Sequence, residues 1–205
     1  INVPNNQRIL HTAPHHDDIE LAYFPLLHHL VRTPSNDNYF VYCTSGFTAV
    51  TNFYVIERLE NLQWLLNTGR ISGDKRLADY NNAQDDITGY LNGIALQDPE
   101  SQRFHISMRL TRLFMNQLKT NDLKKVAAYV GELAQQLKSI EPGRSEPGIF
   151  HQIKGWLREY EAELVWAYFG IDMDHVSHLR LPFYSANIFP EYPNIEEDVI
   201  PIVQL

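Results

Sequence analysis

The sequence predicts an α/β fold, a three-layer α/β/α sandwich with a mainly parallel sheet, in one domain that covers residues 1–205. Residues 8–45 have the pattern strand, loop, helix, turn, strand, which is a βαβ unit and implies parallel strands joined by a right-handed crossover. The composition, 44% hydrophobic and 20% charged, is that of a globular protein with a real core.

Each element of the βαβ unit has its own signal. Residues 8–13 form a short strand-like run, and residues 19–31 repeat apolar side chains at helical spacing, with Pro25 interrupting or kinking the helix. A turn rich in Pro, Asn and Asp follows at 33–38. Residues 39–44 are aromatic and β-branched, as in a buried strand that ends at Ser45 and Gly46.

The remainder is mostly helical. Helices are expected over 51–66, 89–98, 105–118, 123–137 and 150–170, and the pair Asn121-Asp122 is a plausible N-cap for the fourth of these. Residues 178–184 alternate apolar and polar side chains and predict a third strand, and another apolar run begins at Pro201.

Charge and cysteine content exclude several classes of protein. The net charge of −8 repels phosphate backbones, so we expect no nucleic-acid partner. The single cysteine, Cys43, excludes an intrachain disulfide, and its apolar surroundings predict a buried strand residue. No apolar stretch is long enough for a bilayer and no signal peptide opens the sequence, so we expect a cytoplasmic protein without a membrane partner.

Four consecutive ionisable residues, His15, His16, Asp17 and Asp18, follow the first strand. Open α/β sheets bind ligands outside the carboxyl ends of their strands. His15 and Asp18, at positions i and i+3 of a tight turn, could together bind zinc or another divalent metal. Asp17 would then be free to take a proton from a water whose pKa the metal lowers toward about 7. The alternative is structural: Asp17 or Asp18 caps the next helix, and the histidines are ordinary loop residues.

The segment Ala13-Pro14-His15-His16-Asp17-Asp18-Ile19-Glu20 resembles the His-Pro-Asp-Asp-Glu signature of the PIG-L/LmbE family of N-acetylglucosaminyl deacetylases. The resemblance implies a Rossmann-like sandwich, with His15 and Asp18 as zinc ligands and Asp17 as the general base. It covers about residues 8–55 and 150–205, and is closest to LmbE-like domains attached to glucosamine-6-phosphate deaminase-like proteins, which are similar at residues 11–19 and 44–52. The helical stretch of about 67–148 then looks like an insertion of that subgroup.

The sequence also departs from the family. His16 replaces a Pro, Ile19 replaces a Glu, and Phe47 stands where many members have Glu. The family's third zinc ligand is a distal His beyond a further strand, and we expect this sequence to stop before it, so that a complete site needs residues outside this sequence or another chain. The segment 174–178 resembles the distal motif. Because it precedes the predicted third strand, His175 and His178 are expected at the opposite sheet edge from His15, about 20 Å away.

The resemblance implies a metal-dependent hydrolase that removes the acetyl group from an N-acetylated amino sugar, with a glucosamine-6-phosphate deaminase-like domain as a possible neighbour. The alternative is a non-catalytic sugar-binding or assembly domain that kept the fold without a complete zinc site. A third hypothesis, another metallohydrolase such as a phosphoesterase, finds no His-x-His-x-Asp-His pattern to support it.

Overall fold

The computed structural model describes residues 4–71, 77, 83–141, 144–185 and 192–204. The chain divides into two compact units. Unit 1 contains residues 1–49 and 154–205, and unit 2 contains residues 50–153. The chain returns from unit 2 to unit 1 between residues 153 and 154, inside one long helix. Each unit is described by itself.

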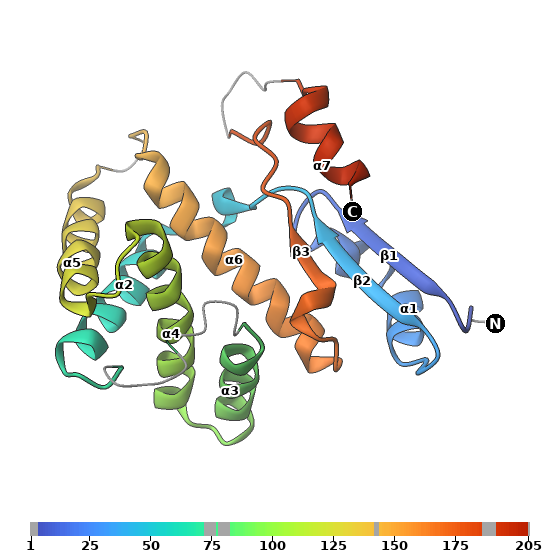
Figure 1. Cartoon of the computed structure of the whole chain (residues 1–205), viewed down its shortest axis with the longest axis horizontal. Coiled ribbons are helices and arrows are strands. Elements are labelled where there is room, and N and C mark those ends of the chain that lie inside the picture. Colours follow the sequence, from blue (N-terminus) through green and yellow to red (C-terminus); the bar gives the residue numbers. More distant parts are fainter. Residues whose placement is uncertain (1–3, 72–76, 78–82, 142–143, 186–191, 205) are drawn as a thin grey trace. The chain divides into compact units, whose positions relative to one another are not determined.

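Unit 1 is built on a parallel sheet with the strand order β1-β2-β3 (Figure 1). Strand β1 (Arg8–Ala13) pairs in parallel with β2 (Asp37–Tyr42), with Arg8 opposite Asp37 and Ala13 opposite Tyr42. Helix α1 (Asp18–Val31) connects them, so the predicted βαβ unit and the parallel sheet are confirmed. The mixed α/β class of the fold is thereby established.

The third strand lies earlier in the sequence than predicted. Strand β3 is Val176–His178, and it pairs in parallel with the second half of β2, so that His178 stands opposite Tyr42. The expected strand at 178–184 is wrong for two local reasons. Arg180 has a positive φ of 52°, which no strand residue adopts, and Pro182 has no N–H to donate to a ladder.

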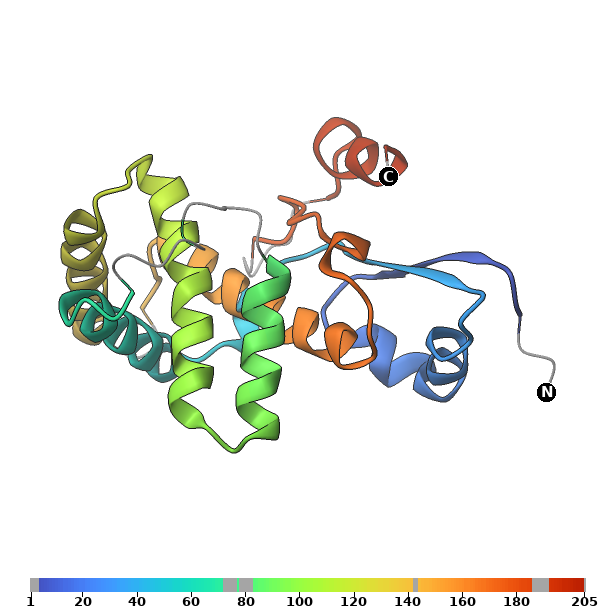
Figure 2. The same cartoon turned by 60° about the horizontal axis from the view of Figure 1, so that its bottom comes forward.

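Helices α1 and α6 (Gly148–Tyr168) lie on one side of the β1 and β2 strands, as Figure 2 shows for the part of α6 in unit 1. The ring of Trp166 stacks on Phe40 at a centroid distance of 3.8 Å, and both side chains are fully buried. Pro25 is tolerated inside α1 because the helix is kinked at Tyr23, whose φ of −149° is not helical. The core of unit 1 therefore lies between this sheet face and these two helices.

Short elements complete unit 1. A 3₁₀ turn η1 (Phe47–Ala49) follows β2, and a second 3₁₀ turn η3 (Met173–His175) precedes β3. A π-helical turn η4 (Ile195–Val199) continues into α7 (Ile200–Val203), the red helix in Figure 1. The apolar run expected from Pro201 is thus helical.

Unit 2 consists, in its described part, of α2 (Asn52–Asn67), α3 (Ala83–Ala95), α4 (Pro99–Leu118), α5 (Leu123–Ser139) and the start of α6. Helices α2, α4 and α5 begin at side-chain caps, because Thr51, Asp98 and Asp122 each accept a hydrogen bond from a backbone N–H of the first turn. The unit begins earlier than the expected insertion at about 67, since α2 packs on α4 and α5. No helix in the described ranges is long and apolar enough to cross a membrane.

Candidate functional site

The loops that follow β1 and β2 are fastened together at the carboxyl edge of the sheet. The backbone N–H of Cys43 donates to the carbonyl of Ala13 at 2.9 Å, and the N–H of Thr44 donates to that of Pro14 at 3.0 Å. The buried Thr44 hydroxyl donates to the same Pro14 carbonyl at 2.7 Å. These bonds fix the point at which residues 15–18 leave the sheet.

The structure brings His15 and Asp18 together. The backbone N–H of His15 donates to Oδ2 of Asp18 at 2.9 Å, and His15 Nδ1 lies 3.6 Å from the same oxygen. Both side chains are about two-fifths exposed, at 42% and 43%. The edge of the His15 ring meets the ring of Tyr184 at a centroid distance of 5.1 Å, so the imidazole rests against an aromatic wall.

Asp17 occupies the N-cap position of α1, but its side chain makes no capping hydrogen bond. Its carboxylate is exposed. The hydrogen bonds therefore do not support Asp17 as the residue that caps α1. The Asp18 carboxylate accepts a hydrogen bond from the backbone N–H of His15, in the loop before the helix, rather than from a backbone N–H of the helix. Asp17 remains an open carboxylate beside the His15–Asp18 pair.

His16 turns into the protein, where it is 4% exposed. Its ring stacks on Tyr42 at 4.7 Å, and its Nε2 lies 3.3 Å from Nδ1 of His178. The second nitrogen of His178, Nε2, lies 3.4 Å from Oε1 of Glu163 in α6, close enough for attraction but without the geometry of a full hydrogen bond. A buried chain of polar side chains, Glu163–His178–His16, thus runs from α6 to the loop.

The two histidine rings of this chain share one hydrogen bond. It joins Nε2 of His16 and Nδ1 of His178, and the tautomers of the two rings decide which nitrogen donates. Nδ1 of His16 is buried with no hydrogen-bond partner in the described part of the chain. Burial, followed by the charges of His178 and Arg158, lowers the pKa of His16 to about 3, so this ring is neutral at physiological pH.

Gly46 is required beside His16. Its φ is +61°, and a Cβ at this position would lie 2.9 Å from Nδ1 of His16. The turn after β2 therefore approaches the imidazole as closely as backbone can, which only a glycine permits.

The structure corrects the expected position of His178, one of the two histidines in the segment 174–178. Because β3 ends at His178, this residue lies at the carboxyl edge of the sheet, on the same side as residues 15–18, and its nearest histidine is His16. His175 lies where the strands begin, with its Nε2 3.9 Å from Oδ1 of Asp37 and its ring on Tyr39. Pro182 is the signal that could have shifted the predicted strand and revealed His178.

A divalent metal fits His15 and Asp18 as a pair. Two ligand atoms about 2.0–2.2 Å from one tetrahedral ion are about 3.4 Å apart, and Nδ1 of His15 and Oδ2 of Asp18 are 3.6 Å apart. Among the residues described, no group of three or more His, Cys, Asp and Glu side chains is arranged to hold a metal ion. The pair therefore accounts for two ligands.

Comparison of the chain with models of protein families, with curated proteins and with solved structures gave no match in any of the three.

Proposed function

We propose that this protein is a divalent-metal hydrolase, with zinc as the expected metal, that removes the acetyl group from an N-acetylated amino sugar. The observation that carries the proposal is the convergence of His15 and Asp18 beside the exposed Asp17, at the carboxyl edge of a parallel sheet. The resemblance of residues 13–20 to the PIG-L/LmbE signature supports it. With it we propose the finer fold, a Rossmann-like three-layer sandwich, and a cytoplasmic location, where the lone thiol of Cys43 stays reduced.

The reaction is hydrolysis of an amide, in which the oxygen of water bonds to the acetyl carbon and the C–N bond breaks. A bound divalent metal supplies Lewis acidity toward the carbonyl and lowers the pKa of water. In this proposal His15 and Asp18 hold that metal. Asp17 takes the proton from water and delivers it to the departing nitrogen, so that acetate and a free amine are the products.

The first experiment measures release of free amine from N-acetylglucosamine by the metal-loaded protein and by Asp17→Asn. A carboxylate that acts as general base contributes about 10²- to 10⁴-fold to the rate, so the variant should lose that much turnover while its zinc content is unchanged. Asp174→Asn is the control, because its carboxylate is 80% exposed and lies before β3. Unchanged turnover in Asp17→Asn removes Asp17 from the mechanism, and lost zinc makes it a ligand.

The second candidate function is a sugar-binding or assembly domain beside a sugar-phosphate enzyme, such as a glucosamine-6-phosphate deaminase-like domain. It is favoured by one observation, that within the described ranges no third side chain joins His15 and Asp18. This candidate predicts saturable binding of the amino sugar without any release of amine. The same assay, run together with a binding measurement, separates the two.

A further inference from the structure

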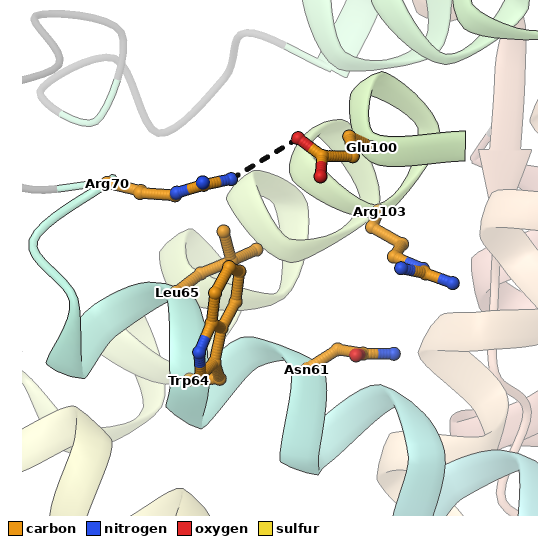
Figure 3. A pocket seen from close by; sticks show the side chains of 6 residues that line it. All are labelled: Asn61, Trp64, Leu65, Arg70, Glu100 and Arg103. Atoms are coloured by element: carbon orange, nitrogen blue, oxygen red, sulfur yellow. Dashed lines mark hydrogen bonds and ion pairs between the residues drawn. The ribbon is translucent and has the colours of Figure 1, made fainter. Parts of the chain in front are cut away.

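A pocket of about 260 Å³ lies in unit 2 between α2 and α4 (Figure 3). Its walls come from three places: the outer face of α2, the segment just after α2, and the first turns of α4. The lining residues are Asn61, Trp64, Leu65, Arg70, Glu100 and Arg103. The pocket is smaller than the range of about 300–1,000 Å³ typical of drug-sized ligands, which favours a ligand of monosaccharide size.

Helical spacing puts these side chains on facing surfaces. Asn61, Trp64 and Leu65 are at positions i, i+3 and i+4 of α2, and Glu100 and Arg103 are at i and i+3 of α4. The capping of α4 by Asp98 fixes its first turn, where Glu100 stands. The two helices pack on each other within unit 2, so the pocket is a property of this unit.

Trp64 is unusual among the tryptophans of the chain. It is 52% exposed, whereas Trp156 and Trp166 are 5% and 0% exposed. Leaving an indole in water forgoes the stabilisation that its burial would give. An exposed indole that forms the wall of a pocket is instead suited to pack against the apolar face of a ligand.

Polar side chains of the pocket are available to form hydrogen bonds with a ligand. In the described part of the chain, neither the side chain of Arg103 nor that of Asn61 has a hydrogen-bond or ion-pair partner. The guanidinium of Arg70 lies 4.8 Å from the centre of the Trp64 ring and 3.4 Å from a Glu100 oxygen. Because Arg70 and Glu100 are 51% and 74% exposed, this ion pair is weak and an incoming anion can compete for Arg70.

The described charged residues of the pocket carry more positive than negative charge. The whole chain has a formal net charge of −8, yet the described lining residues include two arginines and one glutamate. A guanidinium offers a planar fork of N–H donors that matches phosphate and carboxylate oxygens, and an amide such as that of Asn61 both donates to and accepts from hydroxyls. The chemistry present is a cationic fork, an amide and an aromatic wall within one small space.

We propose that this pocket binds a phosphorylated monosaccharide, with the phosphate on Arg103, the hydroxyls at Asn61 and the sugar ring against Trp64. The site lies within unit 2, whereas residues 15–18 belong to unit 1, and it needs no metal. It gives the helical unit a ligand of its own. The proposal does not depend on the hydrolase activity proposed for unit 1.

The test is a titration of the whole protein with glucose 6-phosphate, glucose and inorganic phosphate, at fixed ionic strength and in the presence of a chelator. Trp64 is the most exposed indole, so its fluorescence reports binding, and calorimetry provides an independent isotherm. Glucose 6-phosphate should bind with a dissociation constant of about 1 mM or lower, and at least tenfold more tightly than either glucose or phosphate. Equal binding of inorganic phosphate, or no binding of glucose 6-phosphate, overturns the proposal.

Arg103→Gln should weaken binding of glucose 6-phosphate by about 10- to 100-fold, because it removes charge-assisted hydrogen bonds to the phosphate. Arg103→Lys keeps the charge without the fork and should fall between this variant and the parent. The matched control is Arg144→Gln in the same unit, whose side chain is 73% exposed and pairs with Glu141. Circular dichroism at 222 nm verifies that each variant is folded. Binding by folded Arg103→Gln that equals the parent contradicts the proposal.

Discussion

At the scale of single residues, the four consecutive ionisable side chains lie in different environments. His15 and Asp18 stay partly exposed and close to each other, Asp17 is open to solvent, and His16 is buried against Tyr42 and His178. The sequence predicted the pairing of positions 15 and 18, because i, i+3 spacing in a tight turn brings side chains together. It did not predict the inward turn of His16, which depends on Tyr42 in the next strand and on His178, 162 residues away in the sequence.

Gly46→Ala tests how tightly the turn after β2 approaches His16. A positive φ alone costs an alanine about 1–2 kcal/mol, and the new Cβ would also stand 2.9 Å from Nδ1 of His16. Gly170→Ala is the matched control, because Gly170 has a φ of +81° but nothing within 4 Å of its Cβ position. Urea denaturation should show Gly46→Ala to be the less stable variant by about 1 kcal/mol or more. Equal losses in the two variants would mean that the contact with His16 has no energetic weight.

His11 predicts a loss of stability in acid. Its ring is 4% exposed and has Tyr23 and Asn38 as hydrogen-bond partners. Burial lowers the pKa of His11 in the folded protein, and the bond to Asn38 only partly offsets this. The unfolded chain therefore binds the proton first, so the stability that the neutral ring contributes is complete above a pH of about 6.5 and is lost as the pH falls toward the folded-state pKa.

The measurement for His11 is the free energy of unfolding between pH 7.5 and 5, compared with that of His11→Gln. One proton contributes a slope of at most about 1.4 kcal/mol per pH unit, and the variant should lack that part of the slope. His29→Gln is the control, since His29 is an exposed residue of α1. An unchanged slope in His11→Gln would show that this ring does not couple folding to protons.

At the scale of elements, periodicity predicted the helices and the first two strands because each carries its signal locally. The strand at 8–13 has the predicted bounds, and α2 and α5 begin at most one residue from them. Helices α3 and α4 both begin earlier in the sequence than predicted. For α4 the reason is local, because Asp98 caps the helix and Pro99 is favourable in its first turn. The third strand could not be placed by alternation alone, since pairing with β2 selected Val176–His178 instead.

The bond between Tyr42 and Trp166 joins β2 to α6. The indole N–H of Trp166 donates to the Tyr42 hydroxyl at 2.6 Å, and both side chains are fully buried. Tyr42→Phe leaves that N–H without its acceptor, which should cost about 1–3 kcal/mol of unfolding free energy. Tyr39→Phe, in the same strand, loses only a partly buried bond to Asp37 and should cost less. Equal costs would contradict the assignment of this bond as a tie between strand and helix.

At the scale of the whole molecule, the two units divide the proposed functions. Unit 1 contains the parallel sheet and residues 15–18, and unit 2 contains the helices around the pocket at Trp64. The parallel class of the sheet followed from the βαβ pattern at 8–45. The pocket could not be predicted, because Asn61, Trp64 and Arg103 have ordinary helical spacing in the sequence. Only the packing of α2 on α4 brings them to one pocket.

Calorimetric titration of the metal-free protein with zinc shows whether His15 and Asp18 share one divalent metal. A full tetrahedral site has four ligands, and His15 and Asp18 supply two of them, so a single, weak binding event is expected. His15→Ala and Asp18→Asn should each abolish that binding event, while His175→Ala, at the opposite edge of the sheet, should leave it unchanged. Zinc binding by His15→Ala or Asp18→Asn that equals the parent would contradict the account.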